Sequence, residues 1–203
     1  VASKVSPFSH ALVNAAIYES DPVLYGMAHH VCHMFGLSKA SVCAQLNSIQ
    51  WLHRDPDNGA AAMYALGEMK LPKIGEDKTA FENALYRLSL AKKFDFYSDL
   101  GRELPPLPSA LDDYAHRTEL EAALGHFQMN LPFSPYQTIL AACNGEALNS
   151  LNRRFVCEAI TKQFLREEAS LFDRATALKL ARNLAWDQTQ LNKMNDDLGA
   201  VSA

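Results

Sequence analysis

Residues 31–47 of the chain are VCHMFGLSKASVCAQLN, and this stretch predicts the end of one helix, a turn and the start of another. Gly36 can adopt the left-handed backbone that ends a helix, and Ser38 is a favourable cap for the next helix. Apolar residues on both sides of the turn can fix the angle between the two helices. The stretch therefore predicts a helix-turn-helix.

Helical periodicity extends in both directions from this stretch, and no long alternation typical of strands occurs. Asp21 and Pro22 predict the start of the motif's first helix, and Ser170 with Asp173 predicts a capping box. Nine helices are expected, over residues 9–19, 22–35, 38–54, 56–71, 77–101, 109–130, 134–144, 146–168 and 171–197. We therefore predict an all-α fold, a multi-helix bundle with a helix-turn-helix near the N-terminus.

A proline-rich segment, residues 102–108, is the best candidate for a hinge. It would separate an N-terminal helical part, residues 1–101, from a C-terminal part, residues 109–203, unless both form one continuous domain. The segment also matches the polyproline pattern that SH3 domains bind, through Arg102, Leu104, Pro105, Leu107 and Pro108. The alternative is that the prolines simply end one helix and space it from the next.

The composition, with 48% hydrophobic and 21% charged residues among 203, is typical of a globular protein. A formal net charge of −4 opposes non-specific nucleic-acid binding, which depends on neutralising phosphates. No apolar run reaches the roughly 20 residues that span a bilayer, and no apolar core follows residues 1–4 as in a signal peptide. The cysteines form no Cys-x-x-Cys pair and are interpreted as buried reduced thiols in a cytoplasmic protein, with oxidised pairs as the alternative; they are Cys32, Cys43, Cys143 and Cys157.

Residues 36–42, GLSKASV, resemble the turn and recognition-helix start of bacterial TetR-like transcriptional regulators. The resemblance covers about residues 9–54 and implies an all-helical, dimerising protein whose partner is duplex DNA. The chain departs from that family at Cys43, where an aromatic residue is usual, and near Ile49, where a lysine is expected. The alternative is a helix–turn–helix corner inside an ordinary helical core.

If the second helix of the motif enters the major groove, the nucleic-acid-binding residues are expected to be Ser38, Lys39, Ala44 and Asn47. A DNA-binding form should also gather Lys4, Lys39 and Arg54 near this helix. We therefore predict a non-enzymatic, homodimeric DNA-binding regulator. The alternative is a helical protein-interaction module, such as an effector, adaptor or assembly subunit, that could present the proline motif.

His29 and His33 are candidates for a metal site because they are four residues apart and share a helix face. That face lies opposite the apolar stripe, so the alternative is a pair of solvated surface histidines. No cofactor is expected. Common enzyme signatures such as Gly-x-Ser-x-Gly and His-Glu-x-x-His are missing from the sequence, although catalytic groups dispersed over several helices would show no such signature.

Overall fold

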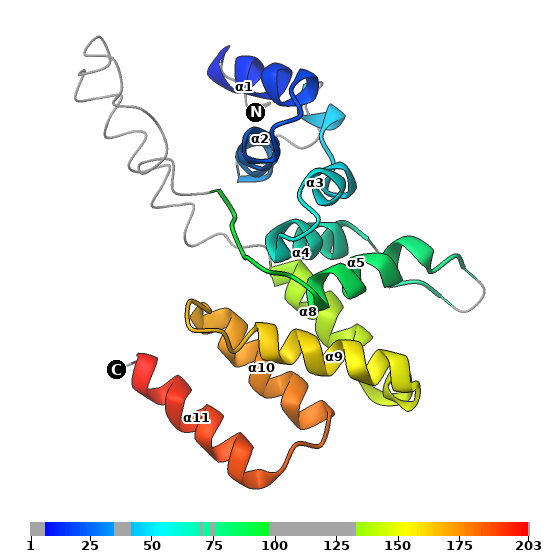
Figure 1. Ribbon diagram of the computed structural model, residues 1–203, viewed down its shortest axis with the longest axis vertical. Helices are drawn as coiled ribbons and strands as arrows, with labels where there is room; N and C mark the ends of the chain where they lie inside the picture. Colours follow the sequence, from blue (N-terminus) through cyan, green and yellow to red (C-terminus); the bar gives the residue numbers. More distant parts are fainter. Residues whose placement is uncertain (1–6, 35–41, 70, 74–75, 98–132, 203) are drawn as a thin grey trace, which may run out of the picture. The chain divides into compact units, whose positions relative to one another are not determined.

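The computed structural model describes residues 7–34, 42–69, 71–73, 76–97 and 133–202 (Figure 1). These ranges contain nine α-helices, two short 3-10 helices and no strand, which confirms the all-α prediction. Within them, no helix is both long enough and apolar enough to cross a membrane.

The chain divides into two compact units, each built from two stretches of sequence. Unit 1 lies within residues 1–55 and 95–132, and unit 2 within residues 56–94 and 133–203. The sequence patterns did not indicate this interleaving. The proline segment expected to act as a hinge, residues 102–108, lies outside the described residues.

Unit 1 contains α1 (Pro7–Tyr18), α2 (Pro22–Met34), the 3-10 helix η1 (Cys43–Gln45) and α3 (Ser48–Arg54). The carboxylate of Asp21 accepts the N–H of Val23 at 2.8 Å, which confirms the predicted start of α2. Helix α2 packs on both α1 and α3. Its central position buries Tyr25 from α2 and Trp51 from α3 completely.

The second helix of the predicted motif is not continuous in the described residues. After η1, Leu46 and Asn47 have extended backbones, with ψ values of 140° and 153°. The side chain of Asn47 accepts the N–H of Gln50 at 2.9 Å and so caps the start of α3. Asparagine is among the strongest N-cap residues, and here it begins a new helix. The prediction of one continuous helix over residues 38–54 is therefore wrong, because the described part consists of η1, two extended residues and the separate helix α3.

Unit 2 contains α4 (Gly59–Glu68), α5 (Thr79–Ser89), α8 (Phe133–Ala142), η3 (Gly145–Asn149), α9 (Leu151–Gln163), α10 (Leu171–Asn183) and α11 (Gln188–Ser202). Helix α4 is its core element, because residues 59–66 are all buried and the helix packs on α5 and α8. A helix that is apolar on all sides can only lie inside the protein. Helices α9, α10 and α11 then follow as successive packed neighbours (Figure 1).

Several predicted helices of unit 2 have different limits in the structure. The helix predicted over residues 77–101 ends at Ser89. The one predicted over 146–168 is η3 followed by α9, and the one predicted over 171–197 is divided where Ala185 has a φ of 57°. The capping box is confirmed, because Ser170 and Asp173 exchange both side-chain hydrogen bonds with each other's backbone N–H groups.

All four cysteines form disulfides, so the prediction of reduced thiols is wrong. Cys32 pairs with Cys43 in unit 1, and Cys143 pairs with Cys157 in unit 2. The two cysteines of each bridge belong to different helices or turns. Their spacing in the sequence therefore does not predict which cysteines pair. Each bridge therefore crosslinks two elements of one unit.

Gly26 lies where α2 comes closest to two aromatic rings of unit 1. A Cβ at this position would lie 2.5 Å from Cδ2 of Tyr97 and 2.9 Å from the ring of Trp51. The Tyr97 ring is held in place, since its hydroxyl donates to Asp55 at 2.6 Å. We expect Gly26→Ala to lower the free energy of unfolding by about 1–3 kcal/mol through overpacking, although alanine favours helix.

Urea unfolding followed by circular dichroism measures this effect. The matched control is Gly199→Ala in α11, where a Cβ would meet no atom within 4 Å. That substitution should leave stability unchanged or raise it slightly, because only helix propensity changes. Equal effects of the two substitutions would contradict the close packing at Gly26.

Candidate functional sites

The residues predicted to contact DNA do not form a helical face in the described residues. Ala44 is exposed in η1, and Asn47 is the half-buried cap of α3. The backbone N–H of Asn47 also donates to the hydroxyl of Tyr25 at 3.2 Å. Ser38 and Lys39 lie outside the described residues, as do the predicted partner-binding residues Arg102, Leu104, Pro105, Leu107 and Pro108.

Arg54, a cation expected near a DNA-binding helix, holds unit 1 together. Its guanidinium donates to the carbonyl oxygens of Ala16 at 2.7 Å and Glu19 at 2.6 Å, at the C-terminal end of α1. It also lies over the ring of Tyr25, 4.3 Å from the ring centroid. The positive charge therefore serves as a C-terminal cap for α1 and as a link between α1, α2 and α3.

The histidines of α2 are not the solvated surface pair considered from the sequence. His29 and His30 are buried and His33 is half-buried. Nε2 of His29 lies 3.0 Å from the hydroxyl oxygen of Ser48, and its ring centroid lies 5.4 Å from that of Trp51. Burial, helped by the neighbouring His29 and His33, lowers the pKa of His30 to about 3, so His30 stays neutral. Helix α2 is buried on more sides than its apolar stripe indicates.

A groove with a volume of about 780 Å³ lies between α5, η3 and α9 in unit 2. Its polar lining combines both signs of charge, and two aromatic side chains form part of the wall. The charged and aromatic residues of the lining are Lys78, Glu82, Tyr86, Glu146, Arg153 and Phe155.

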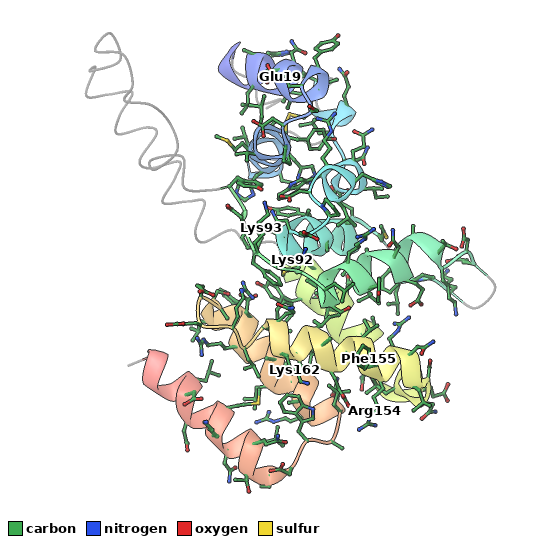
Figure 2. All side chains as sticks on the ribbon, viewed as in Figure 1. Glu19, Lys92, Lys93, Arg154, Phe155 and Lys162 are labelled. Atoms are coloured by element: carbon green, nitrogen blue, oxygen red, sulfur yellow. A yellow bond between two sulfur atoms is a disulfide. The ribbon has the colours of Figure 1, made fainter. Side chains whose placement is uncertain are left out.

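The aromatic side chains of this groove are unusually exposed. Figure 2 labels Phe155 on α9. This side chain is 69% exposed, and Tyr86 on α5 is 51% exposed. Leu151 and Leu90 lie one helical turn from Phe155 and Tyr86, at 83% and 50% exposure. Clusters of large exposed apolar side chains with polar surroundings mark interaction sites on protein surfaces.

Four interactions hold α9, one wall of the groove, in a fixed position. Arg153 donates to the carbonyl oxygen of Ala142 at 3.0 Å and forms an ion pair with Glu82 on α5. Arg154 donates to the carbonyl oxygen of Leu184 at 2.7 Å, just beyond α10. The disulfide to Cys143 fixes the same helix at Cys157. The groove is therefore preorganised, which lowers the entropic cost of binding.

Reasoning from the sequence missed this groove, although a signal for it was present. The buried residues of α9 are Cys157, Ile160 and Thr161, which lie along one side of the helix. Phe155 is two residues before Cys157, about 200° away around the helix axis. The position of Phe155 opposite the buried side of α9 therefore indicates a surface aromatic residue.

Comparison of the chain with protein-family models, with curated proteins and with solved structures yields no match. The geometry of the described residues is therefore the basis for inferring function.

Proposed function

We propose that the chain is a protein-interaction module that binds an amphipathic helix of a partner protein in the groove of unit 2. The exposed pair Tyr86 and Phe155 carries this proposal, since burying two aromatic side chains supplies much of the energy of a typical interface. The groove runs beside two helices, and the described residues contain no strand whose edge a partner could extend. Insertion of a helix is the recognition mode that such a surface supports.

The charges of the groove define the partner helix further. Lys78 and Glu146 line the groove, and Glu82 pairs with Arg153 within it. A partner helix with an apolar stripe, flanked by an acidic residue toward Lys78 and a basic residue toward Glu146, would complement this arrangement. Such rim charges mainly determine the specificity and rate of association rather than its strength.

The two disulfides favour maturation in an oxidising compartment rather than the cytoplasm expected from the sequence. Structural disulfides persist mostly in secreted, periplasmic or lumenal proteins, because cytosolic thiols are kept reduced. Binding to DNA through Ser38, Lys39, Ala44 and Asn47 stays a prediction from the sequence. No observation on the described residues favours it.

The proposal is tested by selecting helical peptides from a displayed amphipathic library on the full chain and measuring their affinity by fluorescence anisotropy. We expect the double variant Tyr86→Ser/Phe155→Ser to weaken binding at least tenfold, because the partner's apolar stripe loses its contacts with the two aromatic residues of the groove. Tyr18→Ser in unit 1 is the matched control, since Tyr18 is 87% exposed and lies far from the groove in sequence. It should not change the affinity.

Two results would contradict the proposal. One is failure to select any peptide, and the other is selection of peptides that bind the double variant as tightly as the original chain. Sedimentation velocity of the chain alone shows whether the chain associates with itself through the groove. Self-association that disappears in the double variant would identify a second copy of the chain as the occupant.

A further inference from the structure

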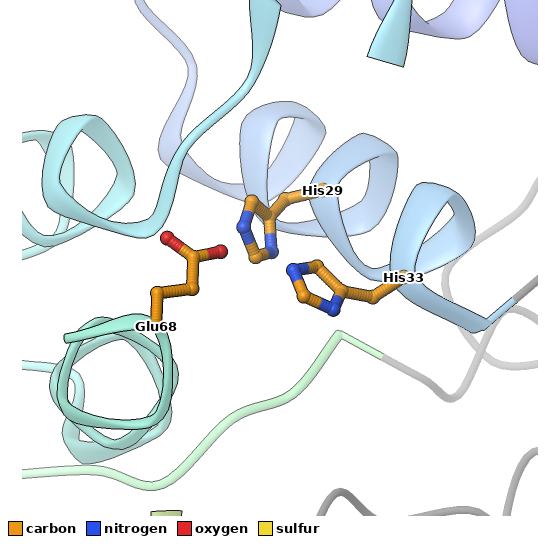
Figure 3. Close-up of side chains that lie close together, drawn as sticks. All are labelled: His29, His33 and Glu68. Carbon is orange, nitrogen blue, oxygen red and sulfur yellow. The ribbon is translucent and has the colours of Figure 1, made fainter. Parts of the chain in front are cut away.

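Two imidazole rings meet on one face of α2 in unit 1. The ring centroids of His29 and His33 are 4.7 Å apart, and a ring nitrogen of each lies within 4.8 Å of the other. Figure 3 shows these nitrogens facing each other. Two nitrogens bound at about 2.0–2.1 Å to one tetrahedral metal ion are about 3.3 Å apart. His33 is half-buried near the end of α2, so rotation of its side chain can bring its ring nitrogen closer to that of His29, to the separation that a shared metal ion requires.

Ser48 contacts Nε2 of His29, the ring nitrogen that does not face His33. Its hydroxyl oxygen lies 3.0 Å from Nε2 of His29, and both side chains are buried. Metal-ligating histidines nearly always make a hydrogen bond through the second ring nitrogen, which fixes the tautomer and the ring orientation. In the tautomer in which Nε2 donates to Ser48, the lone pair of His29 is on Nδ1, on the side of the ring that faces His33.

We propose that His29 and His33 bind a divalent transition-metal ion, and that Cu²⁺ binds more tightly than Zn²⁺. The ligands are nitrogens only, because Cys32 on the same helix is in a disulfide and supplies no thiolate. Imidazole suits both ions, and divalent copper is the stronger binder at nitrogen ligands. Glu68, which Figure 3 also draws, is the last residue of α4 in unit 2 and is not counted among the ligands.

Two protein ligands leave at least two coordination positions for water or an exogenous ligand. The site is therefore of the open type, in which a bound ion can accept a further small ligand. It is independent of the groove in unit 2, and the test of one does not decide the other.

The test is a titration of the full chain, without a histidine tag, with CuCl₂ in a weakly competing glycine buffer. Isothermal calorimetry should show one saturable site, and electron paramagnetic resonance should show nitrogen hyperfine coupling. His33→Gln should lower the affinity at least tenfold, whereas His53→Gln, at an exposed position of α3, should leave it unchanged. Ser48→Ala should weaken binding by about tenfold, because the ring of His29 loses its orienting contact.

Circular dichroism of each variant checks that it is folded. His33→Gln is the decisive variant, because His33 is only half-buried and its replacement should disturb the fold less than a change at buried His29. Absence of saturable binding by the original chain overturns the proposal. So does an affinity that His33→Gln leaves unchanged, or one that His53→Gln lowers equally. Titration with ZnCl₂ should give weaker binding to the same residues, and tighter zinc binding would overturn the preference for copper.

Discussion

Replacing Asp173 by alanine is expected to lower the free energy of unfolding of unit 2 by about 3–5 kcal/mol, the cost of breaking a buried charge network. Asp173 is 3% exposed and accepts hydrogen bonds from the hydroxyl of Tyr136 at 2.9 Å and the N–H of Ser170 at 3.0 Å. Arg166 donates to the same carboxylate at 3.2 Å, and its guanidinium stacks on the ring of Phe94. One side chain thus links α8, the end of α9 and the start of α10.

The size of this effect follows from what the substitution leaves behind. Burial lowers the pKa of Arg166, so its charge is already costly, and Asp173 is the group that compensates for it. Burial, with a further contribution from Asp173, raises the pKa of Tyr136, so its hydroxyl stays protonated. In the Asp173→Ala variant this buried hydroxyl has lost the carboxylate that accepts its hydrogen bond. The capping box at the start of α10 also disappears, which by itself costs about 1 kcal/mol.

Urea unfolding should place Asp173→Asn between the original chain and Asp173→Ala, because the amide keeps an acceptor oxygen but lacks the charge. Asp57→Ala is the control, since Asp57 forms an ion pair with Lys92 in which both side chains are at least 50% exposed. Exposed pairs contribute at most about 1 kcal/mol. If Asp173→Ala costs no more than Asp57→Ala, the network does not stabilise unit 2.

The features that the sequence predicted correctly depend on neighbouring residues. The start of α2 at Asp21 and Pro22 and the capping box of Ser170 and Asp173 involve side chains that bond to backbone groups two or three residues away. Such signals are complete within a short window of sequence. Asn47 carries a capping signal of the same local kind, but it lies within a longer helical pattern that favours one continuous helix.

The features that the sequence did not predict depend on residues far apart in the chain. The apolar stripe of α2 identified one buried side, but contacts with both α1 and α3 also bury His29 and His30. The groove depends on the packing of α5 against α9, whose facing residues Glu82 and Arg153 are 71 positions apart. Periodicity describes one helix at a time and cannot show which helices meet.

The disulfide of unit 2 connects stability to the proposed binding function. Removing it by Cys143→Ala/Cys157→Ala is expected to lower the free energy of unfolding by about 3 kcal/mol. The bridge spans 14 positions, and in the chain-entropy model a loop of about 15 residues contributes roughly that amount. Both sulfurs belong to fully buried residues, so alanine avoids placing an unpaired hydroxyl in the core. Alkylation of the native chain without reductant should label no cysteine.

The second disulfide provides the control that separates binding from stability. Cys32→Ala/Cys43→Ala removes a bridge spanning 11 positions in unit 1, so its cost in stability should be similar. Cys157 lies on the buried side of α9, whose Phe155 lines the groove, so loss of its bridge should loosen this helix and weaken peptide binding as well. Removing the bridge of unit 1 should leave peptide affinity unchanged. Equal losses of affinity in the two variants would indicate that the groove does not depend on the position of α9.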